Sequence, residues 1–119
     1  PFVANSVVTT QHMLEKRPRI VKQFVSALMK GWGEALRPAN EEKAVAIIHR
    51  FDKDTPMELI RKQLGATRAL IKPSADTVIG SIDVAAWAQT EKIMIEQDLI
   101  PGPVLIERDL KRGFLSPLE

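Results

Sequence analysis

A proline-led apolar stripe constrains the fold of this chain most strongly. From Pro18 onward, the run RPRIVKQFVSALMKGWGEAL repeats hydrophobic residues at spacings of three and four. The stripe consists of Ile20, Val21, Phe24, Val25, Leu28, Met29 and Trp32. Because an α-helix turns once in about 3.6 residues, this spacing places the apolar side chains on one face, which must face a core. The run predicts a helix over about residues 18–36.

Three further segments carry the signals of helix termini, over about residues 41–52, 56–71 and 83–99. Asn40 precedes the first, and Thr55, followed by proline and then Glu58, precedes the second in the form of a capping box. Asp83 or Ser81 is expected to cap the third, where Trp87 lies on an apolar stripe and is interpreted as packing. These signals predict a mainly α fold.

Only the first ten residues, PFVANSVVTT, have the character of a strand. Val3, Val7, Val8 and Thr9 favour an extended, pleated backbone, and no helical spacing is present. We therefore expect a short strand over residues 1–10. A lone strand cannot pair its own amides and carbonyls, so its partners should come from polypeptide outside this sequence.

Composition excludes several classes of protein. With 119 residues, the chain is expected to form a single unit over residues 1–119. It has no cysteine, which rules out disulfides and thiolate chemistry. Its net charge of +2 is too small to indicate binding to nucleic acid. No apolar run is long enough to span a membrane, so we expect a soluble chain whose export signal, if any, lies outside it.

No residue pattern indicates catalysis, a metal or a cofactor. His12 and His49 are the only histidines, and neither has acidic residues placed to complete a ligand set or a triad. The glycines form no phosphate-binding motif. The basic run EKRPRIVK, residues 15–22, is interpreted as a solvated face, with contact to phosphate or nucleic acid as the alternative. The sequence thus predicts a protein that is not an enzyme and has no cofactor.

The order of these segments resembles the C-terminal part of periplasmic solute-binding proteins of the NMT1/THI5-like, nitrate/sulfonate/taurine group. The most specific parts are the proline-led helix and the segment GSIDVAAWAQTEKIMIEQDLIPGPV, residues 80–104. The resemblance implies a C-terminal fragment of a two-lobed α/β fold, located in the periplasm or otherwise outside the cytoplasm. It also implies that the full-length protein delivers a small organic or anionic solute to an ABC permease. By their position beside the presumed hinge, Asn5 and Ser6 become candidate ligand-binding residues.

A second hypothesis is a self-contained helical module for protein interaction. Upstream coding sequence would separate the two: a signal peptide and a long α/β region favour the solute-binding protein, and a start codon just before Pro1 favours the module. If the chain is a fragment of a solute-binding protein, we expect it to form homo-oligomers when isolated, because the apolar helical faces that would meet the rest of the protein would be exposed.

Overall fold

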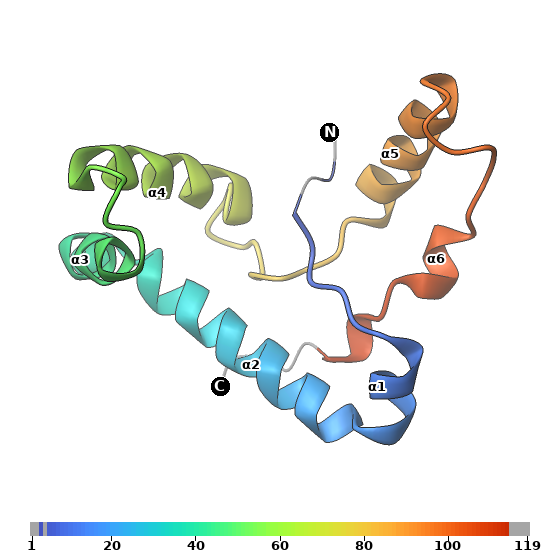
Figure 1. Cartoon of the computed structure of the whole chain (residues 1–119), viewed down its shortest axis with the longest axis horizontal. Coiled ribbons are helices and arrows are strands. Elements are labelled where there is room, and N and C mark those ends of the chain that lie inside the picture. Colours follow the sequence, from blue (N-terminus) through green and yellow to red (C-terminus); the bar gives the residue numbers. More distant parts are fainter. Residues whose placement is uncertain (1–2, 4, 115–119) are drawn as a thin grey trace. The chain divides into compact units, whose positions relative to one another are not determined.

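The computed structural model describes residue 3 and residues 5–114, and over this range the protein is mainly helical. The helices are α1 (Gln11–Lys16), α2 (Pro18–Ala35), α3 (Glu41–Phe51), α4 (Met57–Ile71), α5 (Val84–Glu96) and α6 (Ile106–Asp109). Two single 3-10 turns complete the order, η1 (Pro38–Asn40) before α3 and η2 (Arg112–Phe114) after α6 (Figure 1). None of the described helices is both long and apolar enough to cross a bilayer.

The expected N-terminal strand is wrong. Within residues 3 and 5–114 the structure has no strand, and residues 5–10 form an irregular segment that leads into α1. The expected strand's other positions, 1, 2 and 4, lie outside the described residues. The β-propensity of Val7 and Val8 reflects a fit to a pleated surface, which needs a neighbouring strand to exist. The described part of the chain supplies no such neighbour.

The expected fragment of a two-lobed α/β fold is contradicted for the same reason. An α/β lobe is built on a sheet with helices packed on its faces, whereas the described residues contain helices without a sheet. The resemblance used the order of helix signals, and these signals are shared by many helical proteins. The described residues have the helical character that the sequence predicts and contain no sheet.

The chain forms two compact units, which are described separately. Among the described residues, the first unit contains those up to Gln23 and those from Ser81 to Phe114, and the second is built from Phe24–Gly80. The second unit holds a continuous core of Leu36, Ala44, Val45, Ile60, Leu64 and Ile79, with Met29, Trp32, Ala35 and Ile71 packed against it. In this unit α3 and α4 lie side by side (Figure 1). The inward faces bury Ala44 and Val45 of α3 and Ile60 and Leu64 of α4. The apolar spacing of α3 also predicts a buried side for Ile47, Ile48 and Phe51, but these three residues are exposed.

Helix termini follow the sequence signals in part. Asp83 caps α5 as expected, because its Oδ1 accepts a hydrogen bond from the backbone N–H of Ala86 at 3.0 Å. Asn40 is the N-cap residue of α3, but its side chain makes no capping bond and instead donates to the carbonyl oxygen of Glu34 at 2.9 Å. The cap residue of α4 is Pro56, so Thr55 does not close the expected capping box.

The last turn of α5 explains why this helix stops before residue 99. Asp98 adopts a left-handed conformation with φ of 54°, and its N–H donates to the carbonyl oxygen of Ile95 at 3.0 Å. The N–H of Leu99 donates to the carbonyl oxygen of Met94 at 2.8 Å. These two bonds form a Schellman motif, in which a left-handed residue pairs the last helical carbonyls and turns the chain away. The helix therefore ends at Glu96.

Candidate functional site

In the first unit, the buried hydroxyl group of Thr90 joins the N-terminal segment to α5 by a hydrogen bond. Thr90 is 5% exposed, and its Oγ1 accepts a hydrogen bond from the backbone N–H of Val3 at 2.9 Å. The same hydroxyl donates to the carbonyl oxygen of Ala86, one turn earlier, at 2.8 Å. Both hydrogen-bonding capacities of the hydroxyl are thus used, as a buried polar group requires. Sequence reasoning missed Thr90, since a threonine inside an apolar helical segment gives no signal of a distant partner.

The predicted ligand-binding residues, Asn5 and Ser6, follow directly after this attachment point. Both are exposed and precede α1, where Thr10 Oγ1 accepts a hydrogen bond from the N–H of Met13 at 3.1 Å. Among the contacts of residues 3 and 5–114, no side-chain hydrogen bond holds Asn5 or Ser6 in place. Their assignment to a ligand site remains a prediction from the resemblance.

A small apolar hollow lies beside α5 in the same unit. Its volume is about 100 Å³, and it is lined by Trp87, Thr90, Glu91, Met94, Ile100, Val104 and Ile106. The carboxylate of Glu91 accepts a hydrogen bond from the N–H of Val104 at 2.8 Å, which ties the following loop to the helix. Sites for small molecules usually measure about 300 Å³ or more. The hollow is therefore large enough for one aliphatic side chain and too small for a typical solute site.

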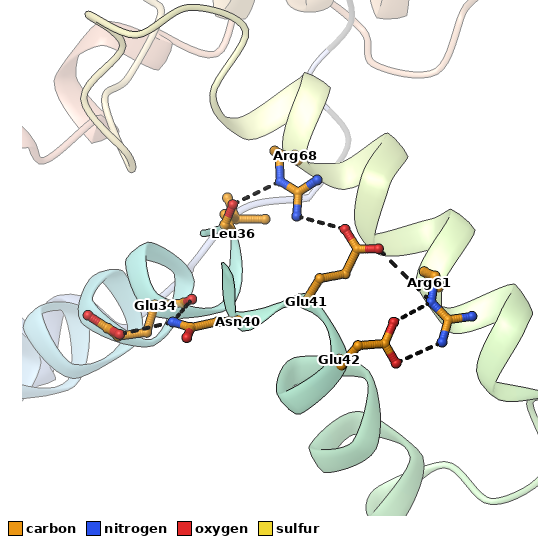
Figure 2. Close-up of polar contacts among 7 residues, drawn as sticks. All are labelled: Glu34, Leu36, Asn40, Glu41, Glu42, Arg61 and Arg68. Carbon is orange, nitrogen blue, oxygen red and sulfur yellow. Dashed lines mark hydrogen bonds and ion pairs between the residues drawn. The ribbon is translucent and has the colours of Figure 1, made fainter. Parts of the chain in front are cut away.

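The second unit carries a network of polar contacts, a charged clasp between α3 and α4 (Figure 2). We use this name for Glu41, Glu42, Arg61 and Arg68. Two parallel bonds of 2.9 Å join Arg61 to the two carboxylate oxygens of Glu42. Glu41 lies between the two arginines, 3.3 Å from Nη2 of Arg68 and 4.0 Å from Nε of Arg61. All four side chains therefore pair across the two helices.

Arg68 also forms a hydrogen bond with the backbone at the C-terminal end of α2. Its Nε donates to the carbonyl oxygen of Leu36 at 2.8 Å (Figure 2). That oxygen belongs to the residue after α2, where helical carbonyls lack partners within the helix. A single guanidinium thus connects three successive segments of the second unit.

The electrostatics of the clasp are those of a surface structure. The hydrogen bonds from Arg61, with a smaller Coulombic attraction, lower the pKa of Glu42, and the same hydrogen bonds raise the pKa of Arg61. The Glu42 side chain is 72% exposed, so solvent screens much of this attraction. Opposite charges already neutralise each other here, and no nucleophile accompanies them. We assign the clasp to structure and not to catalysis.

The histidines take up separate structural positions. His12 is exposed on α1 in the first unit. His49 is on α3 in the second unit, where its Nδ1 lies 3.1 Å from the carbonyl oxygen of Thr55 and donates to it. Across the described residues, no group of three or more acidic, histidine or cysteine side chains is placed to hold a metal ion.

Comparisons with protein-family models, with curated proteins and with solved structures found no match for this chain.

Proposed function

We propose that this chain works by packing against further polypeptide, and that the larger protein is a periplasmic solute-binding protein. In that role it would help deliver a small organic or anionic solute to an ABC permease and would perform no catalysis. The proposal that the chain packs against further polypeptide rests on a second apolar stripe on α4. The proposal of a solute-binding protein is supported by the order of sequence segments, which resembles that of the nitrate/sulfonate/taurine group.

The second stripe, called the outer stripe, consists of Leu59, Ala66 and Leu70. Helical geometry puts these residues about a third of a turn away from the inward stripe that contains Ile60 and Leu64. Leu59 is 46% exposed and Leu70 is 83% exposed, whereas Ile60 and Leu64 are buried. A helix that is apolar on two sides is suited to packing against two neighbours. Within its own unit, α4 packs its inward stripe into the core and leaves the outer stripe open.

Phe51 adds to the apolar surface of the second unit. It is the last residue of α3, and it is 89% exposed. Single exposed apolar residues are common on proteins, but a large aromatic ring together with an apolar stripe on the neighbouring helix favours association. The hollow beside α5 is too small for a typical solute, so the solute would bind with residues of the larger protein.

A helical module for protein interaction is the second candidate, and the outer stripe favours it equally. The two candidates differ in what covers the stripe. In a solute-binding protein the cover is the rest of the same polypeptide, and in a module it is a separate protein. Both predict that the isolated chain self-associates at micromolar concentration.

The experiment compares the wild-type chain with Leu59→Ser/Leu70→Ser by sedimentation velocity. We expect the wild-type chain to form dimers or larger species and the double variant to shift toward monomer, because the apolar contact area is reduced. Leu99→Ser is the control, since Leu99 is 66% exposed but lies outside the outer stripe. A wild-type chain that stays monomeric, or an equal shift for the control, would refute packing through the outer stripe.

Calorimetry with taurine, nitrate and a pyrimidine tests the solute-binding part separately. The isolated chain is expected to bind none of them with useful affinity, because a site must enclose most of its ligand. Co-expression of the chain with any polypeptide encoded directly upstream of it should produce binding of one of these solutes. If that complex binds none of them, the solute-binding assignment fails while the packing proposal stands.

A further inference from the structure

Four cationic side chains gather where α1 ends and α2 begins. They are Lys16, Arg17, Arg19 and Lys22, and all four are exposed. Between residues 5 and 23, the only acidic residue is Glu15, whose carboxylate accepts a hydrogen bond from Nε2 of Gln11 at 2.8 Å. The junction, as we call residues 15–22, therefore presents four positive charges against one negative charge.

Only some of the other lysines and arginines in the described chain form ion pairs, and Lys43 and Lys53, for example, are not among them. Ion pairs are formed by Arg37, Arg61, Lys62, Arg68, Lys92 and Arg108. Over the part of the chain that the structure describes, no ion pair involves any of the four cations of the junction. Arg19 and Lys22 also lie in the first turns of α2, at the positive end of the helix dipole, where cations are locally unfavourable. An anion bound from outside the chain would offset the unfavourable interaction between these cations and the positive end of the helix dipole.

Exposed aliphatic side chains accompany the cations. Ile20 follows Arg19 directly and is 49% exposed, although it belongs to the apolar stripe of α2. In the segment before α1, Val7 is 54% exposed and Val8 is 87% exposed. Residues 5–23 contain no Phe, Tyr or Trp, and their one aromatic ring is the imidazole of His12. Single-stranded nucleic acid is usually held by aromatic stacking in a cationic groove, so this composition does not suit it.

We propose that the junction binds an anionic phospholipid surface, with its cations at the headgroups and Ile20 in the interfacial layer. Clusters of four or more Lys and Arg residues on amphipathic helices are typical of such binding, and partial insertion of an apolar side chain strengthens it. The binding is peripheral. It goes beyond the function proposed above and does not depend on it, because the outer stripe belongs to the other unit.

The test measures co-sedimentation of the chain with vesicles. Vesicles of phosphatidylcholine with about 30% phosphatidylglycerol are compared with pure phosphatidylcholine, at about 0.05 M and about 0.5 M salt. We expect binding to the anionic vesicles at low salt only. Arg19→Gln/Lys22→Gln should lower the partition coefficient about tenfold or more, since each cation near a charged bilayer contributes severalfold.

The matched control is Lys43→Gln/Lys53→Gln. It removes the same net charge from exposed positions of the second unit. The control should change the partition coefficient by no more than about twofold, because these lysines lie outside the junction. Circular dichroism would confirm that both variants keep the helical content of the wild-type chain.

Three results would overturn the proposal. The first is equal binding to neutral and anionic vesicles, and the second is an equal loss for both double variants, which would indicate net charge alone. The third is binding to an oligonucleotide or an acidic protein that depends on the junction, without any binding to anionic vesicles. A further variant, Ile20→Ser, should weaken vesicle binding without changing its dependence on salt.

Discussion

The α3–α4 hairpin and the α5 region are held together in different ways. The hairpin buries Val45, Ile60 and Leu64 in a continuous core and adds the charged clasp on its surface. The α5 region buries Ala86 and Thr90 and depends on specific hydrogen bonds at Asp83, Thr90 and Asp98. Apolar burial is the larger source of stability per residue, whereas single hydrogen bonds contribute less but determine where a helix begins and ends. The two regions should therefore respond differently to substitution.

The largest effect is expected from Ile60→Ala. Ile60 is 2% exposed, and removing its side chain leaves a cavity that should lower the free energy of unfolding by about 3 to 4 kcal/mol. Trp32 packs against this core, and Trp87 lies in the other unit. The fluorescence of a variant that keeps only Trp32 therefore follows the unfolding of the second unit, and that of a variant that keeps only Trp87 follows the unfolding of the first. In urea, the Trp32 transition should shift more than the Trp87 transition. Equal shifts would show that the two units unfold as one.

Thr90→Val tests the α5 region with a change of similar shape. It removes the hydroxyl that accepts from Val3 and leaves that N–H without its partner, at a cost of about 1 to 2 kcal/mol. Hydrogen exchange of the Val3 amide should become faster. Thr90→Ser keeps the hydroxyl and should preserve the protection of this amide. Unchanged exchange in Thr90→Val would contradict the attachment of the N-terminal segment to α5.

Asp98→Gly should stabilise the α5 region by about 0.5 kcal/mol. Glycine adopts the left-handed conformation of this position more readily than aspartate, and it removes a negative charge from the negative end of the helix dipole. Thermal unfolding followed by Trp87 fluorescence would measure the change. A loss of stability would mean that the carboxylate of Asp98 has a favourable role that its backbone conformation does not indicate.

The smallest effect concerns the clasp and is best observed as a titration. In Arg61→Gln the pKa of Glu42 should rise toward its ordinary value, because the hydrogen bonds that lower it are lost. A carboxylate with a lowered pKa in the folded state stabilises the fold above its unfolded pKa, and this stabilisation is lost as the pH falls through the folded pKa. Carbon-13 NMR of the Glu42 carboxyl group measures the shift directly. An unchanged titration would show that the pair is not formed in solution.

The local signals of the sequence determined the helices and several of their ends. Pro18 begins α2 as its fixed φ predicts, and Asp83 caps α5 because a carboxylate at that position can accept from an amide three residues later. The helical period also predicted the buried residues Ile60 and Leu64 of α4. It did not predict which apolar residues of α3 are covered, because Ile47, Ile48 and Phe51 are exposed. The candidate ligand residues, Asn5 and Ser6, depended on a resemblance, and nothing in their local pattern indicates a ligand.

Tertiary structure decided the features that join residues distant in the sequence. No local rule connects Thr90 with Val3 or Arg68 with Leu36, because such hydrogen bonds require the fold to bring the partners together. The strand expected over residues 1–10 failed for a related reason. A helix pairs its backbone within itself and can be recognised from one segment, whereas a strand exists only beside another strand, and the described chain places none next to it.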